Sequence, residues 1–163
     1  MGKIENAKQY FNKICELKIT ERDFLTAVLN YTSGLIQDKK TDDAMFYMMK
    51  FKERFEKEYS NHEAYLATFY SNLAIVYADK DDFQQALAYD QKAYDIRKQV
   101  LGTYSKDMAI TYISLAEDCL QFNRNDEAKE CIIKAEEICK AIFENEDNEL
   151  YQKVLHAKYV LGI

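Results

Sequence analysis

The sequence contains no proline, although average usage would give a chain of this length about eight. Only four of its 163 residues are glycine. Because proline interrupts helix interiors, its absence favours a chain that is helical nearly throughout. Apolar residues make up 48% of the chain and charged residues 31%, which is the composition of a globular protein rather than of a disordered segment.

Long apolar runs and basic runs are missing as well. No apolar run is longer than 44–49, which is far shorter than the ~20 residues needed to cross a bilayer. Charged residues among the first ten (Lys3, Glu5 and Lys8) argue against a signal peptide. A net charge of −6 without a basic cluster argues against a nucleic-acid partner. We therefore expect a cytoplasmic protein with neither a membrane nor a nucleic-acid partner.

Residue types that carry catalysis or hold metals are scarce. The two histidines, His62 and His156, have no companion at a ligand spacing. The sequence has four cysteines, none of them in a C-x-x-C pair: Cys15, Cys119, Cys131 and Cys139. A glycine-rich phosphate loop and a nucleophile elbow are both missing. We expect no catalytic residues, no metal and no cofactor, and we interpret the cysteines as small core residues of a reducing compartment.

What the sequence does contain is a repeat of 42 residues. Ala44, Ala86 and Ala128 are one such interval apart, and three other series of residues keep the same spacing. This period predicts a stack of similar units, each of which needs a neighbour to bury its apolar face. Stacks of this kind usually bind other proteins.

Helical periodicity organises the chain into a single all-α domain, 1–163. It predicts a leading helix over 3–17, helix pairs over 20–59, 62–101 and 105–143, and a closing helix over 148–162. The individual helices within the pairs are expected over 20–37, 41–59, 62–79, 82–101, 106–121 and 125–143, with the closing helix core over 149–161. The architecture that follows is three helix pairs flanked by single terminal helices.

The second helix pair carries a family resemblance. It reads Tyr70-x-x-Leu73-Ala74-x-x-Tyr77, then Phe83-x-x-Ala86, then Ala93, which resembles the tetratricopeptide repeat. The segment 96–102, followed by Ser105-Lys106-Asp107, resembles the end of a kinesin-light-chain-type repeat, a subtype with longer helices and the same interval. The resemblance covers about residues 20–143 and departs from the family pattern at Phe51 and Asn125. It implies a right-handed α-solenoid.

The resemblance also implies a concave groove that holds an extended peptide and is lined by the first helix of each pair. The residues that it places there are Thr26, Leu29, Asn30, Ser33 and Gln37, then Thr68, Ser71, Asn72, Ile75 and Asp79, then Ile110, Ile113, Ser114, Glu117 and Gln121. Asn30 and Asn72 are equivalent, and kinesin-light-chain-type repeats use asparagine there to bond a peptide backbone, since a carboxamide both donates and accepts. The alternative is that both are solvated or tie neighbouring helices.

Two further features describe this groove. The lysines and arginines of a chaperone-type carboxylate clamp are missing from the corresponding positions, so we do not expect a receptor for chaperone tails. The last third of the groove combines Glu117 with Ile110, Ile113 and Leu120. A partner with a hydrophobic anchor and a cation would suit that end.

The helix expected over 41–59 is apolar around more than one face. Either the leading helix covers the extra face, or the face makes a protein contact. Phe46 and Met49 are the first candidates for a contact with a partner or in a homodimer.

The function expected from these features is a non-catalytic adaptor that binds a peptide or helix of another protein in its groove. Two alternatives are left open. One is a self-assembling structural module that uses Phe46 and Met49. The other is a peptide-sensing regulator or secretion-type chaperone, although that family has shorter repeats than the 42 residues found here.

Overall fold

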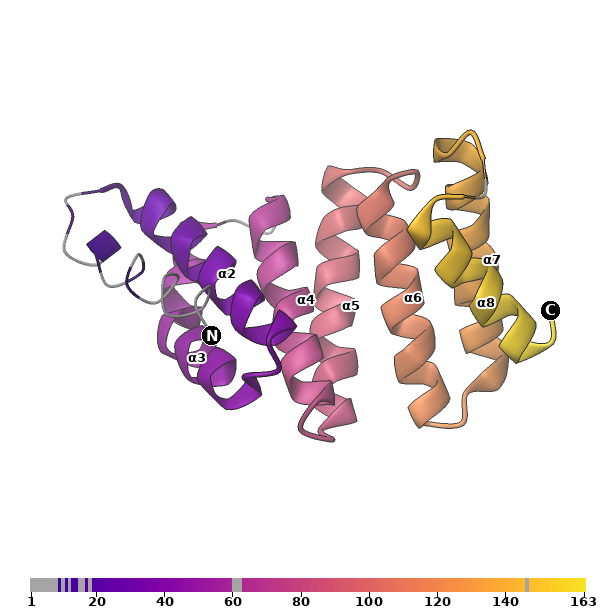
Figure 1. The fold of residues 1–163 in the computed structure, drawn as a ribbon, viewed down its shortest axis with the longest axis horizontal. Coiled ribbons are helices and arrows are strands. Elements are labelled where there is room, and N and C mark those ends of the chain that lie inside the picture. The colour runs from indigo at the N-terminus through magenta and orange to yellow at the C-terminus, as the bar shows by residue number, and fades with distance from the viewer. Residues whose placement is uncertain are drawn as a thin grey trace.

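The computed structural model of the chain describes residues 19–59, 63–145 and 147–163, together with Gln9, Phe11, Lys13, Ile14 and Leu17. These residues contain seven named helices and no strand: α2 (Glu21–Gln37), α3 (Thr41–Glu58), α4 (Ala64–Ala78), α5 (Phe83–Val100), α6 (Lys106–Gln121), α7 (Asn125–Ile142) and α8 (Glu149–Leu161) (Figure 1). Each begins and ends within two residues of its expected bounds. Most of the expected leading helix, Cys15 and His62 lie outside the described residues.

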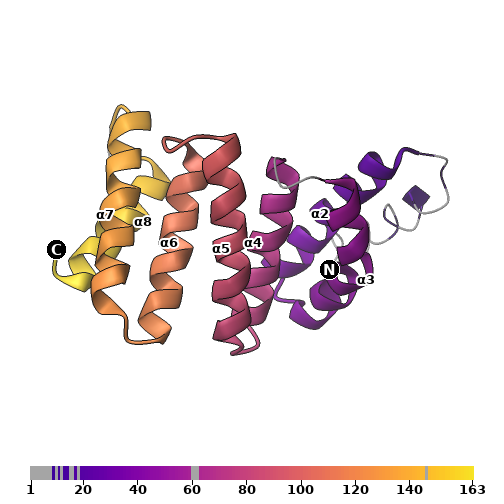
Figure 2. The same cartoon turned by 180° about the vertical axis from the view of Figure 1, so that it is seen from behind.

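The helices pack in sequence order into a row. α2 packs on α3, α4 on α5 and α6 on α7, and the contacts of α5 with α6 and of α7 with α8 join these units. Figure 1 looks onto the side of α2 and α8, and Figure 2 looks onto the opposite side, where α3, α5 and α7 lie in front. The all-α solenoid predicted from the repeat is confirmed.

The turns inside the three helix pairs repeat the 42-residue period in their backbone. Lys39, Asp81 and Asn123 have positive φ angles of 58°, 60° and 56°. In each turn the following amide donates to a carbonyl oxygen five residues back, as from Lys40 to Leu35 at 2.9 Å. These hydrogen bonds close the first helix of each pair in a Schellman motif. A side chain in this left-handed region costs about 1 kcal/mol, and none of the three positions is a glycine.

The hydrophobic core is divided into two clusters. The first extends from Phe11 to Ile96, and the second from Met108 to Val154. In the first cluster the rings of Phe55 (α3) and Phe69 (α4) stack with their centroids 4.2 Å apart. α2 also contacts α4, whereas α6 reaches the second pair mainly through α5. The division therefore falls between the second and third pairs.

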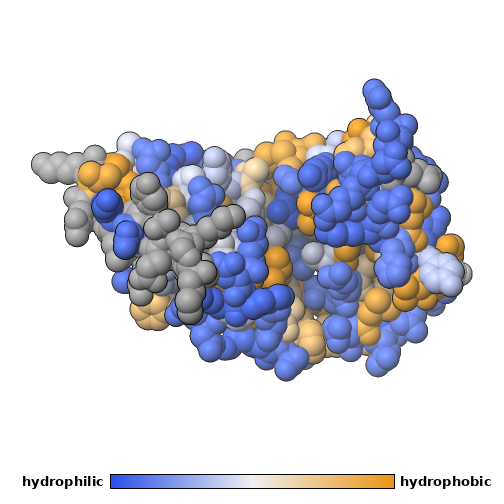
Figure 3. Space-filling model, in the orientation of Figure 1, coloured by the Kyte–Doolittle hydropathy of each residue, from blue (hydrophilic) through white to orange (hydrophobic). Residues whose placement is uncertain are grey.

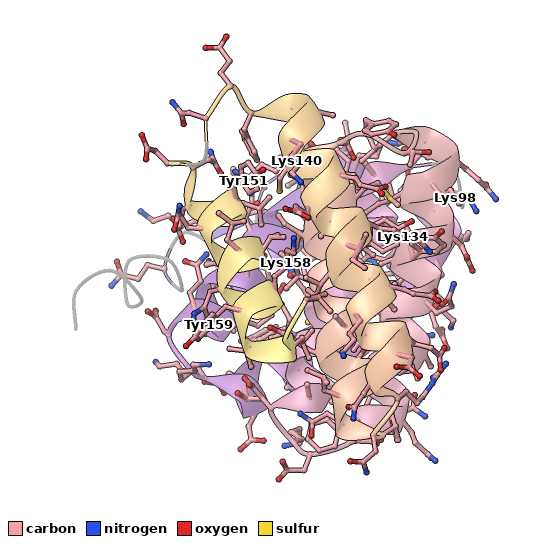
Figure 4. The ribbon with its side chains drawn as sticks, turned by 90° about the vertical axis from the view of Figure 1, so that its right-hand side faces the viewer. Lys98, Lys134, Lys140, Tyr151, Lys158 and Tyr159 are labelled. Carbon is pink, nitrogen blue, oxygen red and sulfur yellow. The ribbon has the colours of Figure 1, made fainter. Side chains whose placement is uncertain are left out.

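α8 closes the stack by packing on α7. The carboxylate of Glu136 on α7 accepts a hydrogen bond from Lys158 of α8 at 2.8 Å and pairs with Lys140 at 2.9 Å (Figure 4). Burial acts to raise the pKa of Glu136, but the two lysines outweigh it and hold that pKa below its usual value. Tyr151 is buried, whereas Tyr159 is 84% exposed.

The extra apolar face of α3 is covered in part. The ring of Phe11, from the leading segment, stacks on Tyr31 at 4.8 Å and meets Tyr47 edge-on at 5.3 Å. Phe46 and Met49 remain 60% and 45% exposed. The leading segment therefore covers Tyr47, whereas Phe46 and Met49 form an open apolar surface, and a protein contact at this surface stays a prediction.

Candidate functional site

The side of the molecule seen in Figure 1 is hollowed near its middle, as the space-filling view in the same orientation shows (Figure 3). The groove residues expected on α2 differ in how much of each side chain is exposed. Asn30 and Gln37 are exposed, and Ser33 is half-buried. Leu29, in contrast, is only 4% exposed and packs in the first core cluster. Leu29 is therefore a core residue rather than part of the open groove surface.

The two equivalent asparagines have different surroundings. The Nδ2 of Asn72 donates to the Oγ of Ser33 at 2.8 Å, and Ser33 donates in turn to the backbone oxygen of Leu29 at 2.8 Å. Asn72 thus ties α4 to α2 and is half-buried, whereas Asn30 is exposed. The tie uses one donor of the Asn72 carboxamide, which has two donors and an acceptor.

Other polar residues expected on α4 also make internal contacts. The Oγ of Ser71 accepts from Arg97 at 2.8 Å, and the carboxylate of Asp79 accepts from Thr41 at 3.1 Å. The hydroxyl of Thr68 donates to the backbone of its own helix at 3.0 Å. The bonds of Ser71 and Asp79 hold α4 to α5 and α3, so these two side chains serve the packing of the stack.

A cavity of about 240 Å³ lies between α4, α5 and α6. It brings together four of the residues expected from the sequence: Ile75, Ser114, Glu117 and Gln121. Its other lining residues, which were not expected from the sequence, are Ala74, Ala78, Phe83, Asp90 and Asp118. On the same helix α6, Ile110 is exposed and Ile113 half-buried, outside the cavity lining.

Buried polar residues concentrate where the two core clusters separate. Asp90 and Arg97 on α5 and Thr111 and Asp118 on α6 are each at most 6% exposed. The Nη1 of Arg97 donates to the Oγ1 of Thr111 at 2.6 Å, in addition to its bond to Ser71. Polar groups therefore occupy the junction between the second and third pairs, where a hydrophobic core would otherwise continue.

The 42-residue alignment of the repeats contains a sequence signal that points to this cluster of buried polar residues. Within the three helix pairs, the residues 42 positions away from its charged members are apolar and at most 2% exposed: Met48 and Ile132 for Asp90, Phe55 and Cys139 for Arg97, and Val76 for Asp118. Charged residues at core positions of a repeat are costly unless they are paired. These charged residues do not stand out when the repeats are compared only at groove positions, because they occupy positions that belong to the core in the other helix pairs.

The carboxyl groups of Asp90 and Asp118 lie close enough together for each to shift the pKa of the other. Burial and then the neighbouring Asp118 raise the pKa of Asp90 to about 8, and Arg97 opposes the shift. Burial also raises the pKa of Asp118 to about 6. The Oδ2 of Asp118 is buried and has no hydrogen-bond partner in the described part of the chain. Near neutral pH the pair therefore retains a proton between its two carboxyls.

Metal-ligating side chains are scattered over the described part of the chain. Within residues 19–59, 63–145 and 147–163 and the five described residues before them, no three His, Cys, Asp or Glu side chains are placed to share a metal ion. His156 is exposed, and Cys119, Cys131 and Cys139 are free thiols. None of the described helices is both long and apolar enough to cross a bilayer.

Comparison with known proteins supports the family resemblance. A family model of the tetratricopeptide repeat matches residues 65–141. Among solved structures, BtubC (BKLC) from P. vanneervenii is similar, with a TM-score of 0.83 over 99% of this chain and 67% of that one. The identity of 15% means that this likeness shows the fold alone. No curated protein sequence matches the chain.

Proposed function

Because residues 65–141 belong to the tetratricopeptide repeat family, whose repeats generally mediate protein–protein interaction, we propose that the chain is a non-catalytic adaptor. It binds a peptide or helix of another protein in the groove formed by α2, α4 and α6. The observation that carries this proposal is the cavity of about 240 Å³ between α4, α5 and α6, which gathers four residues expected in the groove. The cytoplasm is the proposed compartment, since the described cysteines are free thiols.

Exposed apolar side chains on α4 and α6 favour a peptide as the ligand. Ile75 and Ile110 are 42% and 39% exposed, and they come from the first helices of adjacent pairs. Asn30 adds an exposed carboxamide on α2. Apolar contacts supply binding energy, and a carboxamide can pair with a peptide N–H and C=O. This combination suits an extended chain that presents both side chains and backbone.

A displayed library of random peptides tests the proposal whatever the identity of the partner. Peptides selected on the wild-type protein are measured against Ile110→Glu, which places a charge in the groove. Ile133→Glu is the matched control, because Ile133 is 41% exposed but lies on α7. We expect Ile110→Glu to weaken binding by roughly tenfold or more, as for a residue central to an interface. Peptides that respond to Ile133→Glu instead, or a library that yields no binder, would contradict the proposal.

A second candidate function is self-assembly through α3. Phe46 is 60% exposed and Met49 is 45% exposed, on neighbouring turns of one helix. An exposed apolar pair of this kind favours a contact with a second copy or with a partner protein. A homodimer built on this surface leaves the groove of α2, α4 and α6 open.

A further inference from the structure

The cavity between α4, α5 and α6 has apolar walls and an acidic part. The apolar walls come from Ala74, Ile75, Ala78 and Phe83, and the acidic part from Asp90, Glu117 and Asp118. Its volume of about 240 Å³ is several times the ~30 Å³ that one water molecule takes up in the liquid. The cavity therefore has room for a long side chain with an apolar stem and a polar head.

A buried carboxylate oxygen without a hydrogen-bond partner in the described part of the chain indicates which chemical group the cavity would bind. Asp118 lines the cavity, is only 5% exposed, and its buried Oδ2 meets no donor among the described residues. Asp90, which is also 5% exposed, contributes a second carboxyl to the same space. Leaving a buried acceptor without a donor is costly, and each such group calls for an explanation. A donor with positive charge would satisfy the oxygen and offset the negative charge of the Asp90–Asp118 pair.

The cations already near the cavity do not fill this role. Arg97 does not line the cavity, and its Nη1 donates to the hydroxyls of Ser71 and Thr111. Lys153 on α8 is exposed and pairs with Glu149, although its charge also acts on Glu117. The carboxyl groups that line the cavity therefore have no cation among the lining residues of the described chain.

We propose that this cavity binds the cationic side chain of an arginine or lysine in the peptide that the groove holds. The inference rests on the proposed function and specifies the class of its ligand. Phe83, Ile75 and the alanines contact the methylene stem, and Asp118 and Asp90 accept hydrogen bonds from the charged head. Glu117, which is exposed, adds negative charge at the cavity mouth. A metal ion is the less favoured ligand, since the described acidic residues are not placed to share one.

Proton release is a consequence of this mode of binding. In the unliganded protein the Asp90–Asp118 pair retains one proton near neutral pH. Glu117, and Arg97 on the same helix as Asp90, are the other charged groups that act on the pair, and Lys153 acts in turn on Glu117. When the cation enters, both carboxylates ionise and that proton passes to solvent. Linkage then requires the affinity to rise with pH, by up to tenfold per pH unit for one proton released. The rise is expected between about pH 6 and pH 8, where the pair titrates when unliganded.

A peptide pair tests the proposal on the unaltered protein. Peptides are selected from the random library on the wild-type protein, and a selected peptide is resynthesised with citrulline, the neutral isostere of arginine, in place of its basic residue. We expect the arginine form to bind roughly tenfold or more tightly than the citrulline form. Calorimetry in buffers of different ionisation enthalpy should report the release of about one proton for the arginine form only.

Isosteric variants locate the effect in the cavity. Asp118→Asn and Asp90→Asn should remove the preference for arginine over citrulline while leaving the affinity for the citrulline peptide unchanged. Glu130→Gln is the matched control, because Glu130 is exposed on α7 and lines a different cavity, between α5, α6 and α7. It should keep the full preference. A preference that survives both aspartate variants overturns the assignment to this cavity.

The remaining outcomes separate this inference from the proposed function. Selected peptides that bind the groove yet contain no basic residue overturn the inference and leave the adaptor function standing. A library that yields no binder overturns both. Binding of arginine amide alone as tightly as the whole peptide would identify a site for a free small cation and overturn the assignment to a peptide side chain.

Discussion

Asn72 and Ser33 join the first helices of two adjacent repeats: the Nδ2 of Asn72 donates to the Oγ of Ser33 at 2.8 Å. Asn30, one repeat earlier, occupies the equivalent position and is exposed. The same residue type at the same register position therefore meets different surroundings. In the first pair the asparagine is exposed to solvent, and in the second it hydrogen-bonds to the first helix of the neighbouring pair.

The two asparagines should consequently differ in their effect on stability. We expect Asn72→Ala to lower the free energy of unfolding by about 1 kcal/mol, because it removes a half-buried side-chain hydrogen bond and leaves the Ser33 hydroxyl without that donor. Asn30→Ala should change it by less than about 0.5 kcal/mol, as is usual for an exposed site. Urea denaturation measures both values. Equal losses in the two variants would contradict the structural role assigned to Asn72.

The Asp90–Asp118 pair should make stability depend on pH. The pKa of Asp90 is raised to about 8, above its unfolded value of ~3.9, so the folded protein holds this proton more tightly than the unfolded chain. The stability contribution is then fully present below the unfolded pKa and is lost as the pH rises toward the folded pKa. For one proton the loss is at most about 1.4 kcal/mol per pH unit.

Urea denaturation at pH 5, 6, 7 and 8 tests this dependence. The free energy of unfolding should fall across the series in the wild-type protein, and Asp90→Asn should flatten the fall and be more stable than the wild type at pH 8. Asp95→Asn is the control, because Asp95 lies on the same helix and is exposed. If the wild type and Asp90→Asn give parallel curves, the shifted pKa is wrong.

The left-handed turn at Lys39 should be open to stabilisation. Its φ of 58° is strained for a lysine and not for a glycine. We expect Lys39→Gly to raise the free energy of unfolding by about 1 kcal/mol and to raise the melting temperature. Lys50→Gly, inside α3, should have the opposite sign and cost about 1 kcal/mol. A destabilised Lys39→Gly variant would show that the turn has another conformation.

The exposed surface of α3 can be tested by sedimentation. Phe46 is 60% exposed and lies beside Met49, so a dimer that uses this surface should dissociate when Phe46→Glu places a charge in its centre. Analytical ultracentrifugation of the wild type and the variant over a range of concentrations measures the change. Tyr159→Glu is a control at another exposed aromatic residue, which is 84% exposed on α8. A wild-type protein that sediments as a monomer at all concentrations removes the self-assembly hypothesis.

The helices were predictable because they depend on residues close in the chain. The absence of proline, the spacing of apolar residues and the 42-residue interval predicted α2 to α8 within two residues of their observed bounds. The candidate site was predictable only in part. Ile75, Ser114, Glu117 and Gln121 were expected in the groove and line one cavity. Asp90 and Asp118 were not expected, since each looks like an ordinary acidic residue on an amphipathic helix when taken alone.

The repeating unit follows from the sequence alone, because hydrogen bonds and apolar periodicity within a helix pair act over a few tens of residues. Which side chains of neighbouring pairs meet depends instead on tertiary packing. α2 lies against α4 closely enough for Asn72 to reach Ser33, whereas α6 contacts the second pair mainly through α5. The resulting separation of the two core clusters brings Asp90 of α5 to Asp118 of α6. Their meeting depends on how one pair packs on the next, a geometry that no spacing within the chain encodes.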